Sequence, residues 1–456
     1  MAWRMQCQRA CGDFPAKDRE ICSTPYVYAR RRACSTIRAT VRSPARSRQR
    51  GASLRNVPCQ LDIAAERAAT PGCATIAHLN NAGAALPSAA TLDSVITHLR
   101  LEAEIGGYEA ESAVWDVVTA VRTSAATLLG GTIDDVAITG SDTEGFTKAL
   151  WGVHLGGGLQ PGRRILVDRI AYDSHYMGLL QVSELAGTTI EAVPSTTDGT
   201  LDLDALAAAL AGGDIALASL THVGTHRGLV NPVAEASRLC RQAGAITFVD
   251  ACQSVGQLPV DVGAIGCDVL TGTGRKWLRG PRGTGFVYVR AGFISSLRPV
   301  GIDGRSATWD EVNHYRMEDG AQRFIPFETP VAMRLGLGTA IDHALDLGIA
   351  TIADRVGTAA EGLRTRLAGI DGVAVHDGGR LRCGIVTFTV DGHSPMEVAT
   401  TARAAGINVS VTNRPATRLD LGGERPSEVV RASPHYYNTS DELDRLAEVV
   451  SGLRPK

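Results

Sequence analysis

Val249-Asp250-Ala251-Cys252-Gln253 is followed by Thr273-Gly274-Arg275-Lys276-Trp277 and then by Gly280-Pro281-Arg282-Gly283. The first segment has the pattern of a buried strand that ends in an aspartate, and the second is a turn rich in glycine and hydroxyl groups. Read separately, Asp250 would be a strand cap and Lys276 an ordinary solvated lysine. Together, a buried carboxylate and a lysine in a tight turn predict a site that holds and uses a small molecule.

Short apolar runs alternate with amphipathic helical stretches from Ile76 onward, which is the pattern of a mainly parallel sheet covered by helices. We therefore predict an α/β fold. The expected strands lie at 136–139, 164–168, 190–194, 215–221, 245–250, 268–271 and 285–290, and the expected helices at 115–129, 143–151, 174–186, 203–211 and 233–243.

The pattern changes after Pro330 and predicts a smaller α+β region. Its expected helices are 331–347, 351–367, 395–405 and 440–453, and its expected strands are 373–376, 385–390, 407–411 and 429–432. We therefore divide the chain into a leader (1–75), a large domain (76–330) and a small C-terminal domain (331–456).

Residues 1–75 differ in composition from the remainder of the chain. They hold 14 Lys/Arg against 5 Asp/Glu, whereas the rest holds 32 against 43, and six of the ten cysteines fall in this leader. The leader lacks hydrophobic periodicity, and its cysteine spacing matches no zinc template, so we expect it to be disordered. Its composition fits a wrong start or dispensable tail, and also an organellar targeting segment.

The composition of the whole chain narrows the possible partners. A net charge of −2 favours neither nucleic acid nor a membrane surface, and no apolar run reaches the length of a membrane helix. We expect a small-molecule partner and no metal. Four scattered cysteines beyond the leader suit the reducing cytoplasm.

The stretch from about His78 to Val450 resembles the class V aminotransferase family, which includes cysteine desulfurases, isopenicillin N epimerase-like proteins and C–S lyases. The resemblance rests on the strand-end Asp250, on Gln253 and on the Thr-Gly-Arg-Lys turn before Gly-Pro-x-Gly. It implies a fold-type I enzyme that uses pyridoxal 5′-phosphate (PLP) and forms a homodimer. Lys276 would carry PLP as a Schiff base and act as the base at the substrate Cα, and Asp250 would keep the pyridine nitrogen protonated.

The resemblance also implies the other cofactor-binding residues. Asp142 and Thr143, in the loop 140–145 before a helix, would bind the phosphate through backbone N–H groups. Further expected contacts are Thr273 and Arg275 to the phosphate, Gln253 to the phenolic oxygen, Tyr172 stacked on the ring, Thr225 beside the cofactor, and Thr329 across a dimer interface. Cys252 is expected to alternate to the opposite face and pack there, and His175 to be a structural residue of a helix face.

Three residues are predicted to contact an amino-acid substrate. Arg431 matches the family residue that grips the carboxylate, because a guanidinium offers two parallel donors to a planar acceptor. Asn81 lies in a segment that matches the family's opening turn beside the substrate. His226 is either a substrate contact or an ordinary surface histidine.

The reaction type is predicted from an absent residue. Desulfurases use a mobile cysteine between the strand near 407–411 and the carboxylate-binding arginine, and this chain has no cysteine from Gly406 to Arg431. We therefore place a C–S β-lyase acting on an S-substituted cysteine first, transamination second and epimerisation third. A non-catalytic PLP-fold binding protein is the outside alternative, and it would be expected to lose Lys276, Asp250 or Arg431.

Overall fold

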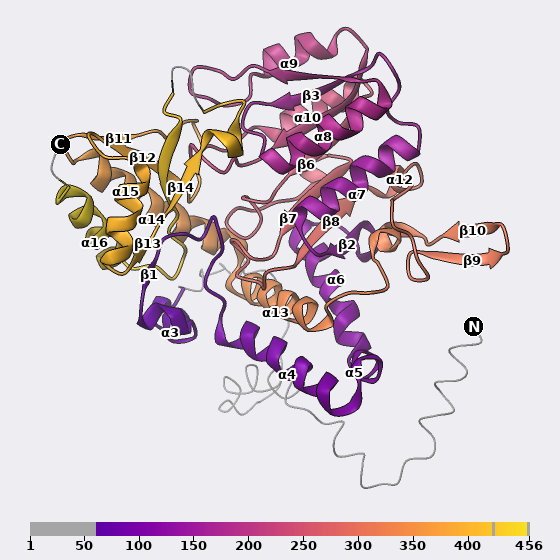
Figure 1. Cartoon of the computed structure of the whole chain (residues 1–456), viewed down its shortest axis with the longest axis horizontal. Coiled ribbons are helices and arrows are strands. Elements are labelled where there is room, and N and C mark those ends of the chain that lie inside the picture. Colours follow the sequence, from indigo (N-terminus) through magenta and orange to yellow (C-terminus); the bar gives the residue numbers. More distant parts are fainter. Residues whose placement is uncertain (1–60, 422–424, 454–456) are drawn as a thin grey trace, which may run out of the picture. The chain divides into compact units, whose positions relative to one another are not determined.

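The computed structural model describes residues 61–421 and 425–453, and the predictions for residues 1–60 lie outside this range (Figure 1). Residues 61–75 correct the expectation of a disordered leader. They form helix α3 (Ile63–Ala68), capped by the Asp62 side chain, and a short 3₁₀ helix, η2 (Pro71–Ala74). Arg67 pairs with Glu442 at 2.9 Å, so this segment is held by a contact with the C-terminal part of the chain.

The central element is a seven-stranded sheet in which β8 alone runs antiparallel to its neighbours. The predicted α/β fold is therefore confirmed. In spatial order the strands are β2 (Val136–Thr139), β8 (Gly285–Val289), β7 (Val269–Thr273), β6 (Ile246–Asp250), β5 (Ile215–Thr221), β3 (Arg164–Asp168) and β4 (Thr189–Val193).

Each strand shares its apolar side chains between the two faces of the sheet, because successive side chains point to opposite sides. On β2, Val136 and Ile138 belong to one buried cluster and Ala137 to the other. The first cluster includes helices α6 (Trp115–Leu129), α9 (Leu203–Leu210), α10 (Val233–Gln242), α11 (Val262–Ile265) and α13 (Val331–Leu347). The second includes α7 (Asp142–Leu155), α8 (Asp173–Ala186) and α12 (Ala291–Ile294). The sheet is thus the middle layer of three.

The C-terminal part has its own sheet and buried cluster. The sheet order is β11 (Val373–Val375), β12 (Val386–Val390), β15 (Glu428–Ala432) and β14 (Ser410–Asn413). Helices α14 (Ile349–Ala368), α15 (Pro395–Ala404) and α16 (Ser440–Ser451) share its core. An N-terminal segment also joins this part of the chain, since β1 (Ala77–His78) pairs with β13 (Ile407–Asn408). The boundary at residue 330 remains a proposal.

Two further groups of elements lie outside the seven-stranded sheet. Helix α4 (Ala89–Ile105) packs against α13 and is followed by α5 (Gly107–Ala113). Strands β9 (Ala307–Glu311) and β10 (His314–Met317) form a hairpin, drawn in orange in Figure 1. Among the described residues, no helix combines the length and apolar character needed to cross a bilayer.

The strand directions position the candidate site. Strands β2, β3, β5, β6 and β7 are mutually parallel, so their carboxyl ends lie at the same edge of the sheet. Thr221, Asp250 and Thr273 end three of these strands. Ligands bind at this edge in open α/β sheets.

Candidate active site

A pocket lies at the carboxyl edge of the sheet and collects most of the residues predicted from the sequence. Its lining includes Asp142, Thr143, Tyr172, Thr225, Asp250, Gln253, Thr273, Arg275 and Lys276. These residues come from several segments, the first and last of which are more than one hundred residues apart in the chain. The fold therefore brings together the motifs that were recognised separately.

Lys276 lies in the turn after β7 and is almost completely buried. Its Nζ donates to Cys252 Sγ at 3.2 Å and lies 6.0 Å from the centre of the Tyr172 ring. Cys252 lines the same pocket, so the expectation that it packs on the opposite face is wrong. Strand β6 ends at Asp250, and the alternation of side chains does not continue into the turn that follows.

Asp250 is the last residue of β6, and its side chain is buried at the pocket. Its Oδ1 accepts a hydrogen bond from the Cys252 backbone N–H at 2.8 Å. Burial and the nearby charge of Asp142 raise the pKa of Asp250, whereas His175 and Lys276 oppose that increase. A buried carboxylate in this position is suited to hold a cationic ligand group against its face.

The loop before α7 exposes backbone donors at a helix start. Ser141 caps the helix by accepting from the Glu144 N–H, and Glu144 in turn accepts from the Gly140 N–H at 2.7 Å. The Thr143 hydroxyl lies 3.1 Å from Ser174 Oγ. The first turn of a helix of this length favours anionic groups.

Three further predicted residues line the pocket close to Lys276, and their side chains already form hydrogen bonds within the protein. Gln253 donates to the Ala82 carbonyl and accepts from Trp277 Nε1 at 2.9 Å. Thr273 donates to the Thr284 carbonyl, and Arg275 donates to the Gly83 carbonyl. These bonds fix the three side chains around Lys276.

Arg431 lies on β15 and reaches the residues of the pocket through Thr225. Its guanidinium donates to the Thr225 carbonyl at 3.2 Å and to the Thr225 hydroxyl at 2.5 Å, and its Nε donates to Ser410 at 3.1 Å. Burial lowers the pKa of Arg431 to about 10. Within the described residues, Arg431 takes part in no ion pair, so a buried cation beside the pocket has no carboxylate partner.

Besides Arg431, which lies beside the pocket, three predicted site residues do not line it. Asn81 is fully buried and bonds to the His78 and Ser433 carbonyls, and the neighbouring Asn80 faces Arg431 at 3.5 Å instead. His226 is buried against Asp420 at 2.7 Å. Thr329 accepts a hydrogen bond from Arg334 of its own chain at 3.1 Å.

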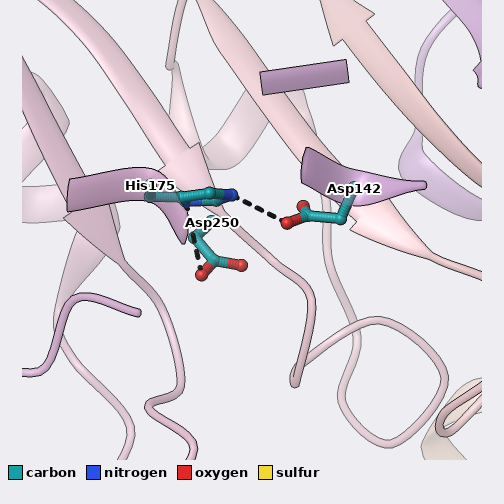
Figure 2. A group of neighbouring side chains, drawn as sticks. All are labelled: Asp142, His175 and Asp250. Atoms are coloured by element: carbon teal, nitrogen blue, oxygen red, sulfur yellow. Dashed lines mark hydrogen bonds and ion pairs between the residues drawn. The ribbon is translucent and has the colours of Figure 1, made fainter. Parts of the chain in front are cut away.

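The sequence interpretation missed His175, which it treated as a structural residue of a helix face. The side chain is buried between Asp142 and Asp250, with Nε2 2.7 Å from Asp142 Oδ2 and Nδ1 3.6 Å from Asp250 Oδ2 (Figure 2). The Asp142 side chain, to which we had assigned no role, is therefore turned toward this histidine. The sequence shows a histidine three residues after Tyr172, but nothing in it indicated that this side chain is buried between two carboxylates.

Comparison with known proteins identifies the family. Residues 77–446 match the family model for "Aminotransferase class-V". A protein of Mycobacterium tuberculosis described as "Probable hercynylcysteine sulfoxide lyase" is 32% identical over 84% of this chain and 91% of its own length. A "Probable cysteine desulfurase" of Methanothermobacter thermautotrophicus is 29% identical over 73% of this chain and 82% of its own. The cysteine desulfurase structure from Thermococcus onnurineus superposes with a TM-score of 0.78 at 22% identity, covering 85% of this chain and 97% of that one.

The chain belongs to the class V aminotransferase family. It is therefore a fold-type I enzyme with PLP as its cofactor, and the predictions of family, fold and cofactor are confirmed. The residues at the pocket fit that cofactor. A lysine amine, a buried carboxylate and a helix start rich in backbone donors lie around one pocket, and they match an aldehyde, a pyridine nitrogen and a phosphate respectively.

Proposed function

We propose that the protein is a PLP-dependent C–S β-lyase that acts on an S-substituted cysteine. When bound, PLP withdraws the electrons of the substrate Cα–H bond into its ring. The chain's own residues then have three tasks: they hold the cofactor, bind the substrate carboxylate and move one proton.

We assign the holding of the cofactor to the residues that line the pocket. Lys276 binds the aldehyde, and Asp250 faces the ring nitrogen. The backbone of Asp142 and Thr143 binds the phosphate together with Thr273 and Arg275. Gln253 contacts the phenolic oxygen, and Tyr172 covers the ring face, with Thr225 at its side.

Arg431 would bind the substrate carboxylate. It is buried and cationic, and its described partners are the neutral oxygen atoms of Thr225, Ser410 and Asn80. An unpaired buried charge is costly, and an incoming carboxylate would offset that cost through two parallel hydrogen bonds. Because Asn80, and not Asn81, faces Arg431, we move the proposed substrate contact to Asn80.

Lys276 would act as the base. Its amine, released when the substrate amine takes its place, would take the proton from Cα. The C–S bond then breaks, and its electron pair leaves with sulfur. Hydrolysis of the remaining three-carbon fragment with one water gives pyruvate and ammonia.

The observation that carries this proposal is the absence of a suitable thiol among the described residues. There is no cysteine from Gly406 to Arg431, where a desulfurase would need a mobile one. Burial raises the pKa of Cys240 to about 11, of Cys267 to about 12 and of Cys383 to about 11, which leaves them as unreactive thiols. Burial also raises the pKa of Cys252, which is fixed beside Lys276.

The relative described as a hercynylcysteine sulfoxide lyase supports the same reaction and suggests the oxidised class of substrate. A sulfoxide leaves as a sulfenate, which is a better leaving group than a thiolate of the same carbon skeleton. We therefore expect cysteine sulfoxides to react faster than the matching thioethers.

The other family reactions receive less support. Epimerisation needs a proton donor on the opposite face of the substrate, and His226, one of the predicted substrate contacts, is buried against Asp420 instead of serving as that donor. Transamination requires no residue that the site lacks. The experiment below must therefore distinguish transamination from elimination.

The test incubates the PLP-loaded enzyme with a cysteine S-conjugate and with its sulfoxide, and measures pyruvate and ammonia. Equal amounts of the two products, absent with Lys276→Ala, are expected. A second arm supplies free cysteine and a third supplies an amino acid with a keto acid. Alanine and sulfane sulfur from cysteine would replace the proposal with a desulfurase, and amino-group transfer alone would replace it with an aminotransferase.

We also propose a cytoplasmic homodimer with composite sites. Tyr108 and Phe327 are exposed large apolar side chains whose rings lie 6.3 Å apart, and Phe327 is close in sequence to Thr329. Exposed aromatic clusters favour a protein interface. The described cysteines Cys73, Cys240, Cys252, Cys267 and Cys383 are all unpaired, which suits a reducing compartment.

A further inference from the structure

His175 is the centre of a chain of three buried ionisable side chains. Its ring lies between Asp142 and Asp250, and each of its two nitrogens faces one carboxylate (Figure 2). The His175 side chain is 2% exposed, and the carboxylates are almost as deeply buried. The three residues thus form one polar unit below the pocket.

The three residues come from three elements that meet at the carboxyl edge of the sheet. Asp142 is the first residue of α7 and belongs to the segment whose backbone is proposed to bind phosphate. His175 lies in the first turn of α8, and Asp250 ends β6. The chain therefore joins the element at the phosphate end of the site to the element at the ring-nitrogen end.

The position of the imidazole is fixed by packing. The ring of Phe146 stacks on that of His175 with centroids 3.8 Å apart and planes 7° from parallel. Phe146 is itself buried in α7, next to Phe248 on β6. Rotation of the imidazole away from either carboxylate would disrupt this stack.

His175 and each carboxylate stabilise one another's charged forms, whereas the two carboxylates repel each other, and the charge of Asp142 raises the pKa of Asp250. Burial alone would lower the pKa of His175, but Asp142 and Asp250 raise it above its ordinary value despite the opposing charge of Lys276. Burial would raise the pKa of Asp142, and the charge and hydrogen bond of His175 lower it overall. A cationic His175 between two carboxylates leaves one net negative charge, which a protonated ring nitrogen would neutralise. Cys252 is another titratable group beside Asp250, and burial raises its pKa so that it stays a neutral thiol.

The cluster has the residue types of a metal site, but its geometry argues against one. Nδ1 and Nε2 lie on different sides of the imidazole, and they face different carboxylates. A single metal ion can bind only one nitrogen of an imidazole. An ion between His175 and one carboxylate would therefore leave the other nitrogen facing the second carboxylate, and the three residues could not all be its ligands in this arrangement.

We propose that His175 and Asp142 are positioning residues for Asp250. His175 orients the Asp250 carboxylate toward the ring nitrogen and keeps it ionised, and Asp142 holds His175 in its cationic form. The inference depends on the cofactor and not on which substrate bond breaks.

The test measures the cofactor dissociation constant of PLP-loaded His175→Ala, His175→Gln and Asp142→Asn by loss of the visible band on dilution. We expect weakening of roughly 10- to 100-fold in each variant, in the range found when the outer partners of ligating groups are removed. Labelled-histidine NMR, assigned with His175→Gln, should show that His175 titrates above its ordinary pKa of about 6.5 in the native enzyme. Its pKa should fall in Asp142→Asn, because one of the two stabilising charges is lost.

A matched control separates positioning from general packing. His98 is also 2% exposed and pairs with one carboxylate, Glu102, at 3.1 Å on α4, away from the pocket. We expect His98→Gln to lower the melting temperatures of the PLP-free and PLP-loaded forms equally and to leave the dissociation constant unchanged. The same pattern in His175→Ala, or an unchanged His175 pKa in Asp142→Asn, would overturn the proposal.

Discussion

Arg431 donates to the hydroxyl of Thr225 over 2.5 Å and in this way joins strand β15 to the loop that follows β5. The bond holds the guanidinium beside the pocket without neutralising it. The arrangement leaves the arginine available for a carboxylate of the substrate, and it predicts how Arg431 variants should behave.

Arg431→Ala should raise KM for the amino-acid substrate on the order of 10²-fold, because truncating one partner of a desolvated charge pair removes several kcal/mol of binding. Arg431→Lys should recover part of the loss, since it keeps the charge but not the two parallel donors. The visible cofactor band should be unchanged in both. Steady-state kinetics check this, with Arg366→Ala, an exposed pair with Asp444, as the control. An unaltered KM in Arg431→Ala would remove this residue from the site.

Gly285→Ala should weaken cofactor binding and lower stability by about 1–3 kcal/mol, the usual cost of overpacking. A Cβ at this position would lie 2.5 Å from the Ser141 carbonyl carbon and 2.7 Å from the Asp142 nitrogen, so the loop before α7 would have to move. The control is Gly357→Ala, where a Cβ meets nothing within 4 Å inside α14. Thermal unfolding and cofactor titration distinguish the two, and equal behaviour would show that the loop has room to adjust.

Shortening the chain tests the role of α3. A chain that begins at residue 61 should match the full chain in cofactor content and melting temperature. A chain that begins at residue 76 should melt several degrees lower, because it loses the pair of Arg67 with Glu442 and leaves Arg279 without its Thr70 contact. Calorimetry on both chains provides the comparison. Equal melting temperatures would mean that α3 contributes nothing to the fold.

The composite site can be tested by mixing two inactive or impaired chains. If Thr329 acts at the neighbour's phosphate, a dimer of one Lys276→Ala chain and one Thr329→Ala chain contains one intact site. Refolding the two together should restore activity to about a quarter of the native level, since half of the dimers are mixed and each has one intact site. Sedimentation must show a dimer. An active monomer, or no recovery in the mixture, would contradict the composite site.

The sheet and the main motif were predictable because their signals are local. Strand 136–139 and helices 115–129 and 331–347 were predicted at their observed bounds, since buried strands and amphipathic helices carry their own periodicity. Asp250 ends β6 and Lys276 lies in the turn after β7, the neighbouring parallel strand. Their meeting at a pocket follows from the topology of a parallel sheet.

The missed features depend on contacts between distant segments. His175 meets Asp142 and Asp250 only because three elements converge, and no local pattern around position 175 records this. The move of the proposed substrate contact from Asn81 to Asn80 is a shift of one residue in a turn, which no sequence pattern determines. Helix α3 is only six residues long, and its order comes from partners near the other end of the chain.

The central claim is that Lys276 is the residue that binds PLP, and the small number of lysines makes it directly testable. The chain has four, Lys17, Lys148, Lys276 and Lys456. Lys148 is engaged with Glu144 at 2.7 Å and with the Phe324 carbonyl. Borohydride reduction of the PLP-loaded enzyme converts an imine to a stable secondary amine, and peptide mass spectrometry then identifies the modified lysine. We predict modification at Lys276 in the native enzyme and in Lys148→Arg, and none in Lys276→Ala. Modification of any other lysine in the native enzyme would contradict the account.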